Sequence, residues 1–339
     1  MGERVRAALI GAGRIGQRHA TTLASAIPAV ELALIADVQG AFAEALAARV
    51  RCPRWSADPV DALTDPTIDA VVIASSTDSH APLIVGAAEA GKSIFCEKPI
   101  ALDLEATDRA LDAVERAGVR LQMGFQRRFD AAYRKAKDLI EAGALGRVEM
   151  IHDAMRDPSP APRSYLETSG GLYRDMTIHN FDCVRWLMGE EVTEVFAMGS
   201  AIVSPVFAEL DDIDTSVVSL RFASNGLGVI DNSRRAGFGY DVRTEVFGSE
   251  ASLMIGYSRE TPMLLLDAKG VHSDHIHWFL ERFDQAYIDE LRVFVQTIID
   301  DTPPPVDGID ARAAMVLAYA AEASRRENLP VSPARFARA

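Results

Sequence analysis

Short apolar runs alternate with amphipathic stretches along the first third of the chain. Several of these runs are hydrophobic at consecutive positions, as expected for strands covered on both faces of a sheet. The expected strands are 5–10, 31–36, 70–75, 93–96 and 119–125, and the expected helices are 15–26, 40–48, 80–90 and 103–117. Because strands and helices alternate, the pattern predicts a doubly wound α/β domain with a parallel sheet and right-handed crossovers.

After about Phe125 the pattern changes to strands with few helices between them. A strand is expected at 148–155, between helices at 130–142 and 173–188, and Gly189 is expected to end the second helix. Further expected strands, separated by turn signals, are 192–198, 215–222, 227–233, 243–247, 252–255 and 263–266. This pattern predicts a second, α+β domain with a large, mostly antiparallel open sheet.

Two helices, expected at 279–299 and 309–325, end the chain on either side of a proline-rich segment at 302–305. We expect the last helix to pack back on the first domain. The predicted domains are therefore residues 1–124, which would bind a nucleotide, and residues 125–339, which would bind a substrate and form oligomer contacts.

Charge and size narrow the choice of partners. The 339 residues suffice for about two domains, and 35 basic minus 49 acidic residues give a formal charge of −14. Such a surface repels nucleic-acid backbones and anionic membranes, so we expect neither as a main partner. A small neutral substrate is not repelled by this negative surface.

The cysteines and the apolar runs bear on where the protein works. Cys52, Cys96 and Cys183 lie far apart and form no C-x-x-C pair, which favours a reduced, cytoplasmic protein. The apolar run at 7–10 is too short for the core of a signal peptide. No stretch approaches the roughly 20 apolar residues of a membrane span.

A glycine-rich segment, GAGRIG at 11–16, directly follows the first expected strand and opens a helix. In that context Gly11 allows a tight turn, Gly13 lets a pyrophosphate approach the backbone, and Gly16 allows close packing of helix on strand. Asp37 ends the second expected strand, where a carboxylate binds ribose hydroxyls and repels a 2′-phosphate. The sequence therefore predicts NAD as the cofactor, rather than NADP or a glycine turn without a ligand.

Lys98 follows the expected strand at 93–96, between Glu97 and Pro99. Ligands of doubly wound sheets bind at the carboxyl ends of the strands, so Lys98 is a candidate to stabilise an alcohol oxygen as a hydride leaves. A surface lysine beside a glutamate is the alternative.

Thr77, Asp78 and His80 follow the strand that ends at Ser75, at the same predicted edge of the sheet. They are expected to line the nicotinamide pocket. The same residues also form an ordinary sequence for the start of a helix.

The expected helix at 173–188 carries Asp175, His179 and Asp182. Spacings of four and three residues place all three on one face of an α-helix. Histidine suits proton transfer near neutral pH, and a carboxylate one turn away can orient it. A helix-capping acid beside a solvated histidine is the alternative.

Two further groups are weaker candidates. His272, His275 and His277 are more typical of a loop than of a zinc site, because no cysteine lies near them. Arg127 and Arg128, at the predicted domain junction, are suited either to binding substrate hydroxyls or to bracing the junction.

In the order and spacing of its motifs, essentially the whole chain resembles the Gfo/Idh/MocA family of oxidoreductases, and within it the inositol dehydrogenases. The segments that carry the resemblance are 11–16 with His19, 77–80, 97–99, 124–129, 175–182, 246–248 and Tyr287. The resemblance implies a Rossmann domain, a second domain with an open sheet, and a homodimer or homotetramer.

The resemblance also implies roles for individual residues. His179 would accept the hydroxyl proton, Asp175 would contact substrate hydroxyls, and Lys98 would bridge substrate and nicotinamide ribose, with no metal required. The implied cofactor contacts are Gly11, Gly13, Arg14, Ile15, Gly16, Asp37, Ser75, Thr77, His80, Glu97 and Lys98. The implied substrate contacts are Lys98, Arg127, Met155, Asp157, Asp175, His179, Phe238 and Tyr287.

Some positions depart from the pattern of the inositol dehydrogenases. Met155 and Asp157 stand where that pattern has histidine and asparagine, Phe238 replaces a tyrosine, and Asn180 stands where aspartate is common. Such changes can alter selectivity strongly. Oxidation of myo-inositol to its 2-keto product is expected, while another inositol, an aldose dehydrogenase, an NAD-assisted glycosidase and a non-catalytic sugar sensor remain alternatives.

Overall fold

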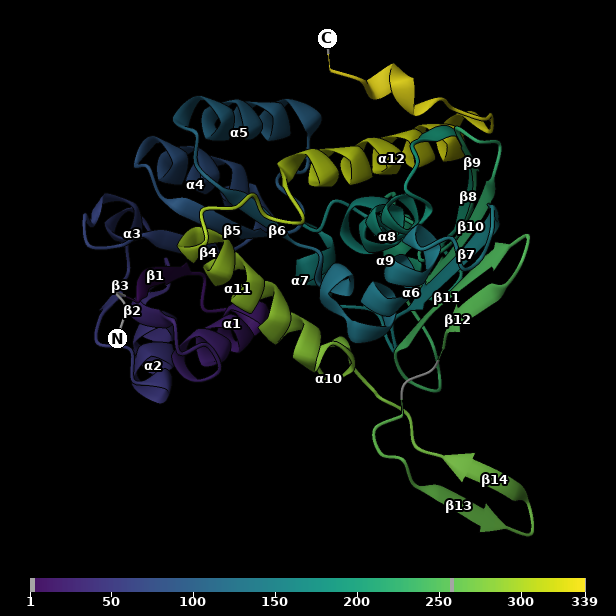
Figure 1. Cartoon of the computed structure of the whole chain (residues 1–339), viewed down its shortest axis with the longest axis horizontal. Helices are drawn as coiled ribbons and strands as arrows, with labels where there is room; N and C mark the ends of the chain where they lie inside the picture. The colour runs from purple at the N-terminus through teal and green to yellow at the C-terminus, as the bar shows by residue number, and fades with distance from the viewer. Residues whose placement is uncertain (1–3, 257–258, 339) are drawn as a thin grey trace. The chain divides into compact units, whose positions relative to one another are not determined.

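The computed structural model describes residues 4–256 and 259–338, which divide into two compact units (Figure 1). Unit 1 is the chain up to Phe129 together with Gln285–Arg312, and unit 2 is Asp130–Asp284 together with the chain from Ala313. The predicted domain boundary at residues 124 and 125 and the predicted packing of the last helix on the first domain stay predictions.

Unit 1 is built on a six-stranded parallel sheet with the order β3-β2-β1-β4-β5-β6. Its strands are β1 (Val5–Ile10), β2 (Val30–Ala36), β3 (Trp55–Ser56), β4 (Ala70–Ile73), β5 (Ser93–Glu97) and β6 (Leu121–Gly124). This order is that of the doubly wound dinucleotide-binding fold, so the predicted fold class is confirmed. The sequence pattern missed β3, because two residues are too short to show a period.

Helices of unit 1 cover this sheet. They are α1 (Arg14–Ser25), α2 (Gly40–Val50), α3 (Val60–Thr64), α4 (Thr77–Glu89), α5 (Leu104–Ala117) and α11 (Asp284–Ile299). Asp103 caps α5, since its side chain accepts a hydrogen bond from the Ala106 N–H. Leu291, Phe294 and Val295 of α11 lie in the same buried cluster as the strand residues, which explains why this late helix belongs to unit 1.

Unit 2 contains a six-stranded mixed sheet with the order β12-β11-β7-β10-β9-β8. Its strands are β7 (Val148–Arg156), β8 (Val192–Ser200), β9 (Thr215–Phe222), β10 (Leu227–Ser233), β11 (Asp241–Gly248) and β12 (Ser252–Ile255). Only the β7–β10 pair is parallel, so the prediction of a mostly antiparallel sheet is confirmed. Buried and exposed residues alternate along β9, as expected where one face packs on helices.

Helices of unit 2 lie on one side of this sheet (Figure 1). They are α6 (Ala131–Glu141), α7 (Arg163–Leu166), α8 (Ile178–Met188), α9 (Pro205–Glu209) and α10 (Phe279–Arg282), and α12 (Gly308–Glu327) runs from unit 1 into unit 2. The sequence missed α7 and α9, which are single turns. None of the helices in the described ranges is both long and apolar enough to cross a membrane.

Strand β13 (Leu264–Asp267) corrects one prediction. It does not join the large sheet but pairs with β14 (Gly270–Ser273), and this hairpin projects away from the sheet of unit 2 (Figure 1). Three consecutive leucines in β13 show no alternation that would mark a buried face, so the sequence could not specify its partner.

Two expected helices are also interrupted. Residues 279–299 form α10 and α11 with a break at Phe283. Residues 173–188 begin with a π-helical turn, Tyr173–Thr177, before α8 starts. Gly189 ends α8 in the left-handed conformation, as predicted.

Candidate active site

The glycine turn between β1 and α1 shows the geometry of a dinucleotide site. Gly11 has φ +102°, and a Cβ there would lie 2.5 Å from the backbone of Ala74 and Ser75. A Cβ on Gly16 would lie 2.0 Å from the Gly11 carbonyl oxygen, whereas a Cβ on Gly13 would meet no atom within 4 Å. Two glycines are therefore required by packing, and the third leaves open space at the start of α1, where a pyrophosphate fits.

Asp37, at the end of β2, is tied to this turn. Its Oδ2 accepts a hydrogen bond from the Ala12 N–H at 2.7 Å, and its Oδ1 accepts one from the Gln39 N–H at 2.8 Å. A carboxylate has about four lone-pair positions, so both oxygens can still accept from ribose hydroxyls. These residues fit NAD.

Lys98 lies directly after β5 in a segment held by buried neighbours. The ring of His80 is 1% exposed and contacts two carbonyl oxygens, that of Pro99 through Nδ1 at 2.8 Å and that of Ser75 through Nε2 at 3.1 Å. Burial lowers the pKa of His80, although both contacts and Glu97 oppose the shift. His80 therefore links the ends of β4 and β5, and its predicted cofactor contact stays a prediction.

Behind Glu97 lies a buried cluster that the sequence analysis missed. Nε2 of His19, on α1, lies 2.7 Å from Oε1 of Glu97. Glu290 of α11 is fully buried, and neither of its carboxyl oxygens has a hydrogen-bond partner. Burial, and secondarily the charge of Glu97, raises the pKa of Glu290 well above its usual value.

Glu290 had a signal in the sequence. It lies three residues after Tyr287 and four before Phe294, on the apolar face of its helix, where an acid is unusual. Donor atoms of His19, Glu97 and Glu290 lie within 4.8 Å of one another, and this is the one such group in the described residues. His272, His275 and His277 do not form one. His272 lies on β14 rather than in the loop that the sequence predicted.

In unit 2, Asp175 and His179 lie at the junction of the π turn and α8. Asp175 is buried in the turn, His179 is half-buried in the first turn of α8, and Asp182 is buried one turn later. The predicted common face assumed α-helical spacing. A π turn widens the repeat, so that spacing argument holds only for His179 and Asp182.

The Asp175 carboxylate is held by two side chains that the sequence analysis did not single out. Tyr165 of α7 donates its hydroxyl to Oδ1 at 2.7 Å, and Arg234, at the end of β10, donates from Nη2 to Oδ2 at 2.8 Å. Arg234 also donates from Nη1 to Oδ2 of Asp157 at 3.3 Å. Burial, together with the charge of Asp175, raises the pKa of Tyr165 and keeps its hydroxyl protonated.

Asn180 has a structural explanation for its departure from the inositol pattern. Its Nδ2 donates to Oδ2 of the buried Asp153 at 2.8 Å, and its Oδ1 accepts from Nδ2 of Asn232 at 3.0 Å. An aspartate at position 180 would place two carboxylates together there, so the amide matches its surroundings.

The remaining predicted substrate residues are divided between the units. Arg127 and Tyr287 are buried in unit 1, and the Tyr287 ring lies edge-on to His19. In unit 2, Met155 is buried on β7, while Phe238 is exposed beside His275. Their contacts with a substrate stay predictions.

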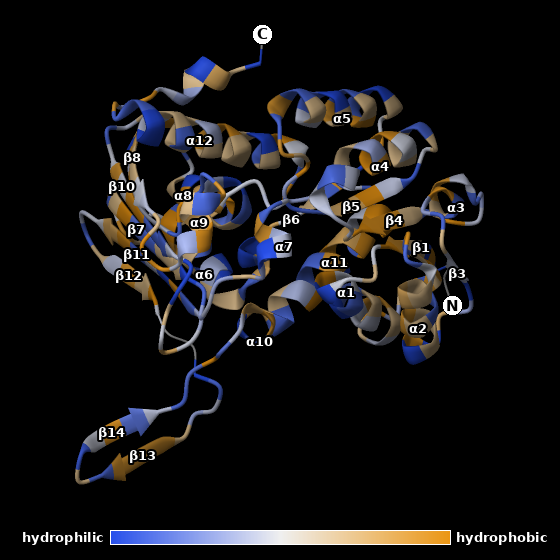
Figure 2. Ribbon diagram, turned by 180° about the vertical axis from the view of Figure 1, so that it is seen from behind, coloured by the Kyte–Doolittle hydropathy of each residue, from blue (hydrophilic) through white to orange (hydrophobic). Residues whose placement is uncertain are grey.

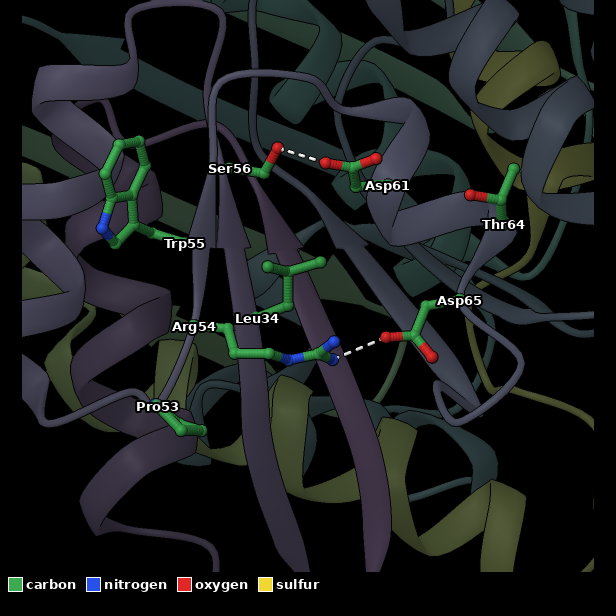
Figure 3. Close-up of a pocket in the computed structure, with 8 residues that line it drawn as sticks. All are labelled: Leu34, Pro53, Arg54, Trp55, Ser56, Asp61, Thr64 and Asp65. Atoms are coloured by element: carbon green, nitrogen blue, oxygen red, sulfur yellow. Dashed lines mark hydrogen bonds and ion pairs between the residues drawn. The ribbon is translucent and has the colours of Figure 1, made fainter.

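A surface pocket of about 540 Å³ lies elsewhere on unit 1, between β3 and α3 (Figure 3). Its wall includes the Arg54–Asp65 ion pair at 2.6 Å and the Ser56–Asp61 hydrogen bond at 2.5 Å. None of the predicted site residues lines it.

A doubly wound sheet with a dinucleotide turn, together with a unit that carries a histidine beside buried carboxylates, defines an NAD-dependent dehydrogenase. Known families agree with this class. Residues 5–125 match the oxidoreductase family with an NAD-binding Rossmann fold, and residues 133–254 match the GFO/IDH/MocA C-terminal domain. The chain belongs to the GFO/IDH/MocA family, which confirms the predicted family, enzyme class and cofactor.

Relatives within the family are similar over their whole length. A myo-inositol 2-dehydrogenase of Thermotoga maritima is 42% identical, with 96% of this chain and 98% of the relative covered. An NAD(+)-dependent scyllo-inositol 2-dehydrogenase of Bacillus subtilis is 38% identical, and the match covers 98% of this chain and 97% of the relative. The crystal structure of a Lactobacillus casei scyllo-inositol dehydrogenase with NAD(H) and scyllo-inositol has a TM-score of 0.93 at 29% identity. The match covers 98% of this chain and 100% of that chain.

Gly13 and Gly16 allow the glycine turn to be tested. We expect Gly13→Ala to fold with nearly unchanged Tm but to bind NAD about tenfold or more weakly, because its Cβ enters the open space. Gly16→Ala forces its Cβ onto the Gly11 carbonyl and should cost about 1–3 kcal/mol of stability. Thermal melting and NAD titration measure both effects. Unchanged NAD affinity in Gly13→Ala would show that the pyrophosphate binds elsewhere.

Glu290 predicts a pH-dependent stability. Because the folded state raises its pKa, stability falls as pH rises above 4.5, by about 1.4 kcal/mol per unit up to the folded pKa. The amide side chain of the variant Glu290→Gln cannot titrate. The Tm of the variant minus the Tm of the wild type should therefore increase as pH rises from 4 towards 9. Glu44→Gln, on the exposed side of α2, is the control and should follow the wild type. Parallel Tm curves for Glu290→Gln and wild type would contradict the prediction.

Proposed function

We propose that this enzyme oxidises one CH–OH group of an inositol to the ketone with NAD. The observation that supports this most strongly is the presence of the required groups in each unit. Unit 1 carries the glycine turn, Asp37 and Lys98, and unit 2 carries Asp175 and His179. Relatives named for myo- and for scyllo-inositol are similar to the chain to nearly the same degree, which supports the substrate class rather than one stereoisomer.

In the proposed reaction, each residue has one task. His179 accepts the proton of the reacting hydroxyl, and the Lys98 ammonium stabilises the negative charge that develops on its oxygen. Asp175 accepts hydrogen bonds from hydroxyls of the ring. NAD, when bound, supplies the acceptor for the carbinol hydride, so the products are a ketone, the reduced cofactor and one proton.

The assignment of individual residues to the substrate and to the cofactor is also part of the proposal. Arg127, Met155, Asp157, Phe238 and Tyr287 are assigned to the polyol, and Arg14, Ile15, Ser75, Thr77, His80 and Glu97 to the cofactor, together with the glycines. Met155 and Phe238 offer no strong hydrogen-bonding group where the inositol pattern has histidine and tyrosine. We therefore expect them to influence which inositol is preferred.

We also propose a cytoplasmic homo-oligomer. The register of the large sheet places apolar side chains on its exposed face: Met150, Met198, Val217, Leu227, Phe247 and Met254. The β13–β14 hairpin exposes Leu264, Leu265 and Leu266, and Figure 2 shows the hydrophobic colouring of β13. An isolated hairpin is marginal in water, so a second copy of the chain is the expected cover. All three cysteines lie in the described ranges and none forms a disulfide, which supports a reducing compartment.

Turnover tests the proposed reaction. Purified enzyme should reduce NAD with at least one of myo-, scyllo- and chiro-inositol, and less well with aldoses or with NADP. Lys98→Ala and His179→Ala should each lose about a hundredfold or more in kcat, with little change in NAD affinity. Lys135→Ala, at an exposed position of α6, is the control and should keep wild-type turnover.

Several results of these assays with inositols, aldoses and the two cofactors would contradict the proposal. NAD binding without reduction on any polyol or sugar indicates a sensor, and glycoside cleavage without net reduction indicates a glycosidase. Preference for an aldose indicates an aldose dehydrogenase, and preference for NADP contradicts the role of Asp37.

Light scattering tests the oligomer. The wild type should have the mass of a dimer or tetramer of the 36.8 kDa chain. Met254→Asp, on the open face, and Leu266→Asp, on the hairpin, should shift it towards the monomer, because each places a charge in an apolar contact. Ile309→Asp, at an exposed apolar residue of α12, is the control. A monomeric wild type would disprove the proposed oligomer.

A further inference from the structure

Arg234 is the most completely buried cation near the predicted substrate residues of unit 2. It directly follows β10, and its side chain is 4% exposed. Its backbone N–H donates to the Asp214 carbonyl at 2.8 Å, so the main chain at this position is fixed as well. Its Nη1 and Nη2 bind Asp157 and Asp175, while its buried Nε has no hydrogen-bond partner.

Two carboxylates, those of Asp157 and Asp175, face the single positive charge of Arg234. Burial disfavours the guanidinium charge, but the carboxylates of Asp175 and Asp157 outweigh it and raise the pKa of Arg234. One cation thus serves two carboxylates. Asp157 stands where the inositol pattern has a neutral asparagine, so this chain has added the second anion.

The geometry orients both acids. The Asp175 carboxylate is held at Oδ2 by Arg234 and at Oδ1 by Tyr165, two partners on different elements. Its oxygens retain further lone pairs for a ligand. The side chains of Asp157 and Asp175 are 18% and 8% exposed, whereas that of Arg234 is 4% exposed, so both acids are more accessible to a ligand than the cation that binds them.

We propose that Arg234 is a positioning residue. Its guanidinium holds the carboxylates of Asp175 and Asp157 in fixed orientations, as a pair of acceptors for neighbouring hydroxyls of a neutral polyol. Charged acceptors held in this way bind hydroxyl donors more strongly than neutral ones, and they select substrates with more than one hydroxyl. The proposal rests on the proposed function, and it adds Arg234 as the origin of polyol recognition.

A pH signature separates this role from simple packing. A cation beside a carboxylate lowers the pKa of that carboxylate, so loss of Arg234 should raise the pKa values of Asp175 and Asp157. The acidic limb of kcat/KM would then move to higher pH. Two other titratable groups interact with Arg234, namely Tyr165 of α7 and Asp212 from the segment after α9. His179 follows Asp175 by four residues, in the first turn of α8.

Arg234→Gln tests the proposal, with Arg282→Gln as matched control. Arg282 forms a buried ion pair with Asp130 at 2.7 Å, its side chain is 9% exposed, and it binds none of these carboxylates. Each variant is compared with wild type in Tm, NAD affinity, kcat, KM for the best inositol and the pH profile of kcat/KM. A monohydric alcohol such as cyclohexanol is measured alongside.

We expect Arg234→Gln to raise KM for the inositol about tenfold or more, the loss typical of a hydrogen bond to a charged group, and to shift the acidic limb upward. Its NAD affinity should stay within about twofold of wild type, well under the roughly 1.4 kcal/mol that a tenfold change represents. The ratio of inositol to cyclohexanol kcat/KM should fall. Arg282→Gln should lose stability while keeping the wild-type KM and pH profile. The double variant Arg234→Gln/Asp157→Asn should regain stability relative to Arg234→Gln, because it removes one uncompensated carboxylate.

Other results overturn the proposal. It fails if Arg234→Gln and Arg282→Gln change KM and the pH profile equally, or if Arg234→Gln loses NAD affinity as much as substrate affinity. If Arg234→Gln does not fold, Arg234→Lys keeps the charge but cannot bind both carboxylates in the same geometry, and Tyr165→Phe removes the other Asp175 partner. Unchanged KM in both of these variants also overturns it. A wild type that oxidises no inositol overturns the proposed function instead.

Discussion

Compensation of buried charge is the constraint on which both halves of the proposed site depend. In unit 1, Glu97 stands beside Lys98 and is backed by His19 and by the buried carboxyl of Glu290. In unit 2, Asp175 and Asp157 share Arg234. Removing water from a carboxylate costs several kcal/mol unless a proton, a donor or a cation replaces it, so each proposed functional acid requires a specific partner.

The two units solve this problem in different ways. Burial raises the pKa of Glu290, and its carboxyl oxygens have no hydrogen-bond partner, so burial favours the protonated, neutral form of this side chain. Asp175 has the hydroxyl of Tyr165 and the permanent cation of Arg234, so it remains an acceptor. The difference suits the proposed tasks, because a charged carboxylate accepts hydrogen bonds from hydroxyls more strongly than a neutral one, whereas Glu290 is assigned no contact with a ligand.

Local patterns in the sequence predicted much of this enzyme. Apart from the short β3 and α3, the strands and helices of unit 1 follow from signals within a few residues. The same holds for the glycine turn, for Asp37 and for the position of Lys98 directly after β5. The π turn before α8 was not predicted, because its local sequence also suits an α-helix. Glu290 could have been suspected from its place on an apolar helix face, whereas Arg234 had no signal beyond its position after a strand.

The sequence by itself determined the fold class, the cofactor and the candidate catalytic residues, because periodicity and motif spacing are encoded over short distances. Tertiary structure decided which groups compensate the buried acids and where β13 pairs. Arg234 is 59 residues from Asp175, and His19 is 78 residues from Glu97. Contacts across such separations depend on how whole elements pack, and no local pattern of hydrophobic and polar residues specifies them.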